Sequence, residues 1–239
     1  MIVSHRHKFI FVKTRKTAGT SVQEAVASIC GPEDIVTSTS ITEGSYQPRH
    51  FRGAPTPFLY LRQNPSRHRT SRILYWAGRC TRIHDHMFLD ELLALPEAEA
   101  WRGYFKFTVE RNPWEKVVSR YFWKYRDRPK RPEFDRFIQK DRLNSDFNMY
   151  SLDGKLRMDY VCRYETLNDG LAEVSRIIGA KIPPLAHQNV SARGSRDYRE
   201  LYNDTTREQV ARHFAREIAL FGYTFDPAPR PGAREPLTS

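Results

Sequence analysis

Cysteines and long apolar runs are scarce in this chain, and acidic residues are fewer than basic ones. The 239 residues include three cysteines, Cys30, Cys80 and Cys162, which are widely spaced and form no CxxC pair, so neither a disulfide framework nor a zinc site is indicated. Apolar runs such as "FIFV" are far too short to span a bilayer, and the N-terminal "MIVSHRHK" lacks the apolar core of a signal peptide. These absences predict a soluble protein of a reducing, cytoplasmic compartment.

Basic residues outnumber acidic ones. Lys and Arg total 39 against 28 Asp and Glu, a formal net charge of +11. Such an excess favours a strongly anionic partner, either a nucleic acid, a phosphorylated small molecule or an acidic polymer, although a well-solvated basic surface gives the same composition. The length and the hydrophobic content fit one sizeable core. We therefore expect one domain over residues 1–225 with a variable insert near 37–82, and a Pro-rich, disordered tail over 226–239.

Apolar strands alternate with helices outside the insert, which itself is Pro- and Arg-rich with one strand candidate at Phe58–Leu61. The expected strands are Lys8–Lys13, "YFKFTVE" and the start of "MDYVCRYETL". The expected helices are Thr20–Ile29, Phe88–Leu95, Pro113–Tyr125, Asn168–Ile178 and a last helix that Asp204 caps and Gly222 ends. This alternation predicts an α/β fold with a central parallel sheet flanked by helices.

The loop "RKTAGTS" joins the first strand to its helix. Such a loop presents backbone N–H groups at the positive end of the helix dipole, which suits phosphate. Ala18 and Gly19 are small enough to let an anion approach, and Lys16 adds a positive charge. Further donors are the hydroxyls of Thr17, Thr20 and Ser21. The loop differs from the Walker A pattern because its lysine precedes the glycine, and this disfavours a magnesium-dependent NTP enzyme. An ordinary polar loop capped by Thr20 would show the same spacing.

A second segment, "FTVERNPWEKVVSRY", repeats this arrangement. Arg111 follows a strand, and Ser119 lies two turns into the next helix. Together the two segments resemble the sulfotransferase family, specifically its membrane-type carbohydrate branch with heparan-sulfate 2-O-sulfotransferase, chondroitin sulfotransferases and bacterial relatives. The resemblance continues through "RYETL", "LAHQNVSARGSRDYRELY" and "IALFGYTF". It implies a sulfotransferase fold with a P-loop-like strand-loop-helix unit.

The resemblance also implies a donor, 3′-phosphoadenosine 5′-phosphosulfate (PAPS), and assigns residues to it. The 5′-phosphosulfate is expected at Lys16, Thr17, Ala18, Gly19, Thr20 and Ser21. The 3′-phosphate is expected at Arg111 and Ser119. Three residues depart from the family pattern: Arg15 replaces a proline and so bears on loop rigidity, Lys116 stands where arginine is frequent, and Glu110 replaces an apolar residue. None of these changes removes a group that grips the donor.

Sulfuryl transfer to a hydroxyl needs a base, and histidine suits that task near neutral pH. The segment "IHDHMF" supplies His84 and His86 shortly before the arginine strand, where the heparan-sulfate enzyme has a similar H-x-H pair. We expect His86 to be the base, with His84 or Asp85 orienting it or the sugar. Lys16 is expected to stabilise charge on the leaving phosphate, without a metal ion. Weaker candidates for the nucleotide pocket are Arg163, Tyr164, His187, Ser191 and Arg193.

The sequence thus predicts a PAPS-dependent sulfotransferase that acts by in-line transfer on a carbohydrate or glycolipid, acidic acceptors included. The alternative is a basic nucleic-acid-binding module, supported by the net charge and by "RYFWKYRDRPKR". Against it, the aromatic residues of that stretch fall at helical spacing with Val117 and Val118, which predicts core packing. A small-molecule kinase would require magnesium and ATP. Acceptor identity, oligomeric state and peripheral membrane association stay open.

Overall fold

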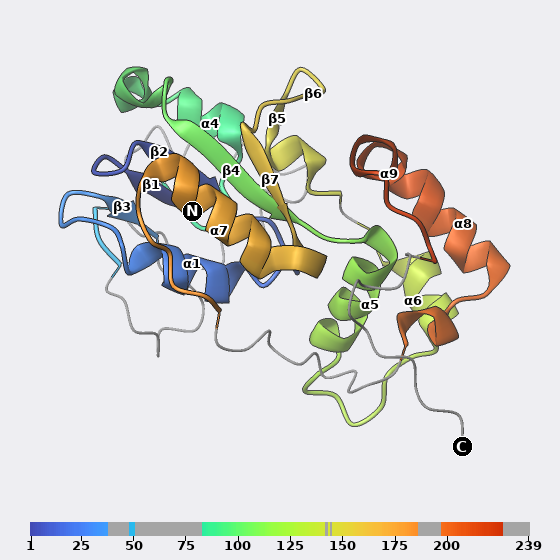
Figure 1. Cartoon of the computed structure of the whole chain (residues 1–239). Coiled ribbons are helices and arrows are strands. Elements are labelled where there is room, and N and C mark those ends of the chain that lie inside the picture. The colour runs from blue at the N-terminus through green and yellow to red at the C-terminus, as the bar shows by residue number, and fades with distance from the viewer. Residues whose placement is uncertain (38–47, 51–82, 142, 144, 186–196, 227–239) are drawn as a thin grey trace, which may run out of the picture. The chain divides into compact units, whose positions relative to one another are not determined.

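The computed structural model describes residues 1–37, 48–50, 83–141, 143, 145–185 and 197–226 (Figure 1). The chain divides into two compact units, one of residues 1–111 and 146–190 and one of residues 112–145 and 191–239. The strand candidate Phe58–Leu61 and the tail beyond residue 226 lie outside the described residues. A single domain over 1–225 therefore stays a prediction.

A five-stranded sheet forms the centre of the first unit, in the order β3-β1-β2-β4-β7. The strands are β1 (Ile2–Ser4), β2 (Phe9–Val12), β3 (Ile35–Val36), β4 (Phe105–Glu110) and β7 (Tyr160–Arg163). β2, β4 and β7 run parallel, which confirms the predicted parallel arrangement, whereas β1 is antiparallel to both β2 and β3. Only residues 5–8 separate β1 from β2, and a parallel pair would need a much longer crossover. The sheet is therefore mixed.

The central parallel strands, β2 and β4, are buried on both faces over most of their length. Phe11 pairs with Phe107, and both side chains join one apolar cluster with helices α1 (Gly19–Ala27) and α7 (Leu167–Ile178). Figure 1 shows these two helices on the same side of the sheet. Neighbouring strand residues such as Ile10 point to the opposite face and are equally buried. β2 and β4 thus end in buried residues, Val12 and Glu110, which the packing holds in place.

Short elements complete the first unit. They are α4 (Leu89–Leu93), the 3₁₀ turns η2 (Pro96–Trp101), η3 (Phe147–Met149) and η4 (Tyr164–Thr166), and the hairpin of β5 (Ser151–Leu152) and β6 (Lys155–Leu156). α4 confirms the helix expected near residues 88–95. Gly179 ends α7 with a φ of 64°, as its position predicted.

Helices make up the described part of the second unit. They are α5 (Pro113–Lys124), α6 (Phe134–Lys140), η5 (Tyr198–Leu201), α8 (Asp204–His213) and α9 (Ala215–Phe221). Asn112 caps α5 by accepting a hydrogen bond from the Trp114 N–H at 3.1 Å, and Pro113 takes the first helical position, both as predicted. No helix in the described ranges is long and apolar enough to cross a membrane.

The last helix differs from the prediction in two ways. Asn203, not Asp204, is its N-cap, because the Asn203 side chain accepts from the Thr206 N–H at 2.9 Å while the Thr206 hydroxyl accepts from the Asn203 N–H. The expected single helix also breaks at Phe214, which separates α8 from α9. Gly222 ends α9 with a φ of 62°, as predicted.

The aromatic stripe of α5 packs inward. Tyr121 and Phe122 are buried with Val117 and Val118 in the apolar cluster of the second unit. Trp123 is the exception, since 51% of it is exposed. The stripe mainly serves the core, as its helical spacing predicted, and this weakens the nucleic-acid alternative.

Candidate active site

The loop between β2 and α1 has a strained backbone. Lys16 and Ala18 both have positive φ angles, 62° and 57°, which residues with a side chain rarely adopt. Ala18 is the N-cap of α1, and within the described part of the chain no side chain caps this helix. Its first turn also carries no acidic residue. The start of α1 therefore keeps the positive end of its dipole available for an anion.

The predicted loop residues lie together but are not equally exposed. Lys16, Thr20 and Ser21 are half-buried, whereas Thr17 is fully buried. The Thr17 hydroxyl lies 2.9 Å from that of Thr14, whose hydroxyl donates to the Val109 carbonyl on β4. The side chain of Thr17 thus fastens the loop to the sheet.

Gly19 has to be small for a reason that the sequence did not reveal. A Cβ at this position would lie 2.8 Å from Lys13 Cγ and 3.2 Å from the Thr14 carbonyl oxygen. The Lys13 side chain, which is 3% exposed, fills the space beside the start of α1. Gly19 therefore makes room for a lysine of the protein itself.

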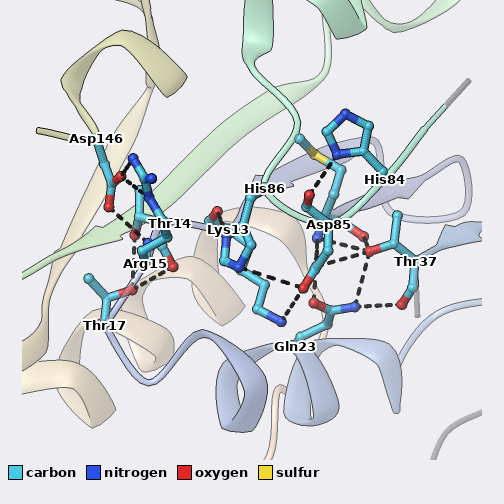
Figure 2. A network of polar contacts seen from close by, with 11 residues as sticks. Lys13, Thr14, Arg15, Thr17, Gln23, Thr37, His84, Asp85, His86 and Asp146 are labelled. Atoms are coloured by element: carbon cyan, nitrogen blue, oxygen red, sulfur yellow. Dashed lines mark hydrogen bonds and ion pairs between the residues drawn. The ribbon is translucent and has the colours of Figure 1, made fainter. Parts of the chain in front are cut away.

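Arg15 is tied to a distant segment (Figure 2). Asp146 accepts hydrogen bonds from the Arg15 backbone N–H at 2.9 Å and from Arg15 Nε at 2.6 Å, and its carboxylate also pairs with Nη2. Asp146 has no exposed surface. This buried carboxylate holds the loop where the family pattern has a proline.

Arg111 joins the same loop from the end of β4. Its Nη1 donates to the Lys16 carbonyl at 3.3 Å, and its guanidinium lies over the Tyr164 ring, 3.9 Å from the centroid. The neighbouring Glu110 is buried and accepts from the Tyr150 hydroxyl at 2.8 Å. The structure therefore supplies a partner for this second departure from the family pattern. Ser119 is half-buried on α5 and belongs to the second unit.

His86 reaches the loop from the segment before α4. Its Nδ1 lies 2.9 Å from the Lys13 carbonyl oxygen. Because a carbonyl only accepts hydrogen bonds, Nδ1 carries the proton in the neutral ring and Nε2 keeps a lone pair. The side chain is 32% exposed, so Nε2 belongs to a ring that solvent reaches.

The pKa of His86 lies below its ordinary value. Burial is the main cause, the Asp85 carboxylate opposes it, and the Lys13 ammonium adds to it. The Asp85 Oδ2 atom is 3.8 Å from His86 Nε2 and 2.7 Å from Lys13 Nζ. His84 instead bonds through Nδ1 to the Asp85 carbonyl, and Figure 2 shows its ring on the far side of Asp85 from Lys13. The two histidines thus differ in their described hydrogen bonds, since that of His86 goes to the loop and that of His84 goes to Asp85.

Asp85 is the centre of a polar network. Besides Lys13, its carboxylate accepts from the Met1 amino group at 3.1 Å and from the Thr37 hydroxyl at 3.2 Å. Burial alone would raise the pKa of Asp85, but the Met1 amino group, Lys13 and His86 outweigh it and hold the pKa well below its usual range. Asp85 is therefore a stable negative charge beside His86.

Sequence reasoning missed Lys13 and Asp146. The position of Lys13 directly after a strand is the one feature of the sequence that could have marked it as a site residue. Nothing in the sequence near Asp146 indicates that it binds the loop. Arg163 is exposed, and the weaker candidates His187, Ser191 and Arg193 lie outside the described residues. Among the described residues, no group of three or more His, Cys, Asp or Glu could hold a metal ion.

Three comparisons relate this chain to known proteins. An uncharacterised protein of Archaeoglobus fulgidus is 30% identical over 105 residues, which cover 41% of this chain and 86% of that protein. The crystal structure of mouse sulfotransferase SULT7A1 complexed with PAP aligns with a TM-score of 0.45 and 15% identity, over 90% of this chain and 86% of that one. The sequence model of the sulfotransferase family matches residues 1–224. Since this match spans almost the whole chain, the protein belongs to the sulfotransferase family.

Proposed function

We propose that this sulfotransferase moves a sulfuryl group from PAPS to a hydroxyl of a carbohydrate or glycoconjugate, with His86 as the proton acceptor. One observation carries the proposal: two backbone carbonyls of a single loop hold the side chains expected to act on the acceptor and on the donor. The Lys13 carbonyl bonds His86 Nδ1, and the Lys16 carbonyl accepts from Arg111. Residues from three distant segments thereby meet where the helix dipole favours an anion.

The residues present fit a donor that carries phosphate groups. Lys16 and the N–H groups at the start of α1 would hold its 5′ end, and Arg111 with Ser119 would hold its 3′-phosphate, as the family resemblance implies. When bound, PAPS supplies a sulfuryl group on a phosphate leaving group. Lys16 stabilises the charge that builds on that phosphate, which is a preorganised electrostatic role.

His86 supplies the base. Its Nε2 atom takes the proton of the acceptor hydroxyl as the hydroxyl oxygen attacks sulfur. The ring is ready for this at neutral pH because its pKa lies below the ordinary 6.5. General-base catalysis of this kind contributes about 100- to 10,000-fold to the rate.

The acceptor class rests on the resemblance to the carbohydrate branch and on the charge. A formal net charge of +11 favours an acidic glycan or glycolipid over a neutral one. We also propose a cytoplasmic location, because the described cysteines, Cys30 and Cys162, are free thiols.

Incubation with sulfur-labelled PAPS and a panel of cell-envelope glycans, followed by mass spectrometry of the labelled product, tests the proposal. We expect Lys16→Ala to lower transfer by about 100-fold or more while the fold stays intact, the usual scale for one preorganised charge-stabilising group. Lys106→Met is the matched control, since the Lys106 ammonium donates to the Arg102 and Tyr104 carbonyls just before β4 and not to a residue of the loop in the contacts described. Near-native transfer by Lys16→Ala would refute the assignment of this loop to the donor.

The base is tested separately. His86→Ala should lose about 100- to 10,000-fold in turnover yet bind adenosine 3′,5′-bisphosphate (PAP) as the unmodified protein does, because the base does not hold the nucleotide. Calorimetry with PAP measures the second quantity. If His84→Ala is inactive while His86→Ala stays active, His84 is the base and the assignment of the two histidines is reversed.

A further inference from the structure

Lys13 is a buried cation whose side chain has no role in the reaction proposed above. It is the first residue after β2, outside the segment that the family pattern assigns to the donor. Its stem runs past Gly19 at the start of α1, and its ammonium ends on Asp85 Oδ2 at 2.7 Å. A single side chain therefore spans from the anion loop to the segment that carries the histidines (Figure 2).

Lys13 acts on His86 through two separate groups. Its carbonyl accepts the hydrogen bond of His86 Nδ1, which leaves Nε2 as the nitrogen with the lone pair. Its ammonium binds Asp85 Oδ2, the same oxygen that lies 3.8 Å from Nε2. One residue thus selects the ring tautomer and also faces the carboxylate next to the reactive nitrogen.

The charges around Nε2 oppose one another. Asp85 alone would attract a proton to Nε2 and produce an imidazolium, which cannot accept the proton of an acceptor hydroxyl. Lys13 counteracts that attraction. The Met1 amino group also binds Asp85, but burial lowers its pKa to about 6, so it is largely neutral at pH 7 and leaves this role to Lys13. His84 faces away and meets only the Asp85 carbonyl in the contacts described. Of these groups, only Lys13 touches both Asp85 and His86.

We propose that Lys13 is a positioning residue of sulfuryl transfer: its carbonyl fixes the tautomer of His86, and its ammonium holds Asp85 so that Nε2 stays unprotonated at neutral pH. The inference rests on the proposed function, because it gives Lys13 a role only if His86 takes the acceptor's proton. The proton moves from the acceptor oxygen to Nε2, and Lys13 takes no part in that transfer.

Two charge-removing variants should change the reaction in opposite directions. Lys13→Met keeps the carbonyl and removes the cation, so Asp85 is left to draw a proton to Nε2. The acid limb of kcat/KM should then move to higher pH by about one unit, which means roughly tenfold less activity on that limb. Asp85→Asn removes the attraction instead and should move the limb to lower pH. Lys106→Met, the matched control, should leave the limb in place.

Nuclear magnetic resonance titration of the His86 ring, assigned with His86→Gln, measures the same shifts without turnover. Opposite shifts for Lys13→Met and Asp85→Asn in both titration and rate support the proposal. Unmoved or same-direction ring titrations in folded variants overturn it, even if His86→Ala is inactive. An active His86→Ala instead overturns the base assignment and removes the role of Lys13 with it. Should Lys13→Met fail to fold, Lys13→Gln carries the test with the same expected shift.

Discussion

Removal of the Asp146 carboxylate is expected to weaken nucleotide binding as well as the fold. In Asp146→Ala, the Arg15 backbone N–H and its guanidinium lose their buried acceptor. The neighbouring Lys16 and Ala18 hold positive φ angles, and such strained residues persist only when surrounding contacts enforce them, at roughly 1–3 kcal/mol each. Without Asp146 the loop can relax into conformations that do not bind an anion.

The magnitude follows from the burial of the pair. Breaking a buried ion pair by removing one partner costs about 3–5 kcal/mol, and the lower end applies because the Arg15 side chain is 20% exposed and regains water. About 3 kcal/mol lowers Tm by roughly 6–12 °C in a protein of this size. PAP must then also restore the strained loop on binding, so its affinity should fall about tenfold or more, since 1.4 kcal/mol corresponds to a factor of ten.

Thermal unfolding and calorimetry with PAP at a temperature where the variant is folded measure the two effects. Asp34→Ala is the matched control: Asp34 is 1% exposed and accepts hydrogen bonds from Ser4, His5 and Arg6 before the start of β2, whereas the loop follows its end. It should lose Tm without losing PAP affinity. If Asp146→Ala behaves like Asp34→Ala, with lower Tm and unchanged affinity, the bracing of the loop is refuted.

Three further outcomes are expected. kcat/KM should fall as the pH drops through the pKa of His86, with a midpoint below 6.5 because burial lowers that pKa and only the unprotonated ring accepts a proton; a midpoint above 6.5 would contradict this. Calorimetry should show much tighter binding of PAP than of AMP, with most of the difference lost in Arg111→Ala and less in Ser119→Ala, since charge-assisted hydrogen bonds contribute about 1.5–3 kcal/mol each; equal affinities in the unmodified protein would remove the 3′-phosphate assignment. Gly19→Ala should lower Tm by several degrees, because its Cβ would lie 2.8 Å from Lys13 Cγ and overpacking costs about 1–3 kcal/mol; an unchanged Tm would show that the lysine moves aside freely.

The sequence predicted those parts of the fold that depend on local patterns. The pattern of an apolar strand followed by a helix predicted three pairs: β2 and α1, β4 and α5, and β7 and α7. These pairs could be predicted because strand and helix periodicities are visible within a few consecutive residues. The cap of α8 shows the limit of this approach. Asn203 and Asp204 are both good capping residues, and only the reciprocal bonds with Thr206 decide between them.

The site was predicted less completely, since the ion pairs that hold it together join residues far apart in the chain. The loop lysine and the H-x-H segment came from a motif resemblance, which shows groups that bind ligands. Arg15 and Asp146 are 131 positions apart, and Lys13 and Asp85 are 72 apart. Local periodicity carries no information about such pairs. They became visible only in the folded structure, which brings the segments around Asp85 and Asp146 to the loop that follows β2.

The two departures from the family pattern that the structure explains, Arg15 and Glu110, find their partners in one five-residue segment. Asp146 binds the first, and Tyr150 binds the second. A loop transplanted from a relative with proline at position 15 would leave the Asp146 charge buried without its cation, so an engineered chimera has to exchange residues 146–150 together with the loop. For the same reason, a lineage that changed residue 15 alone would pass through a poorly folding intermediate, and the two segments are expected to have evolved as a pair.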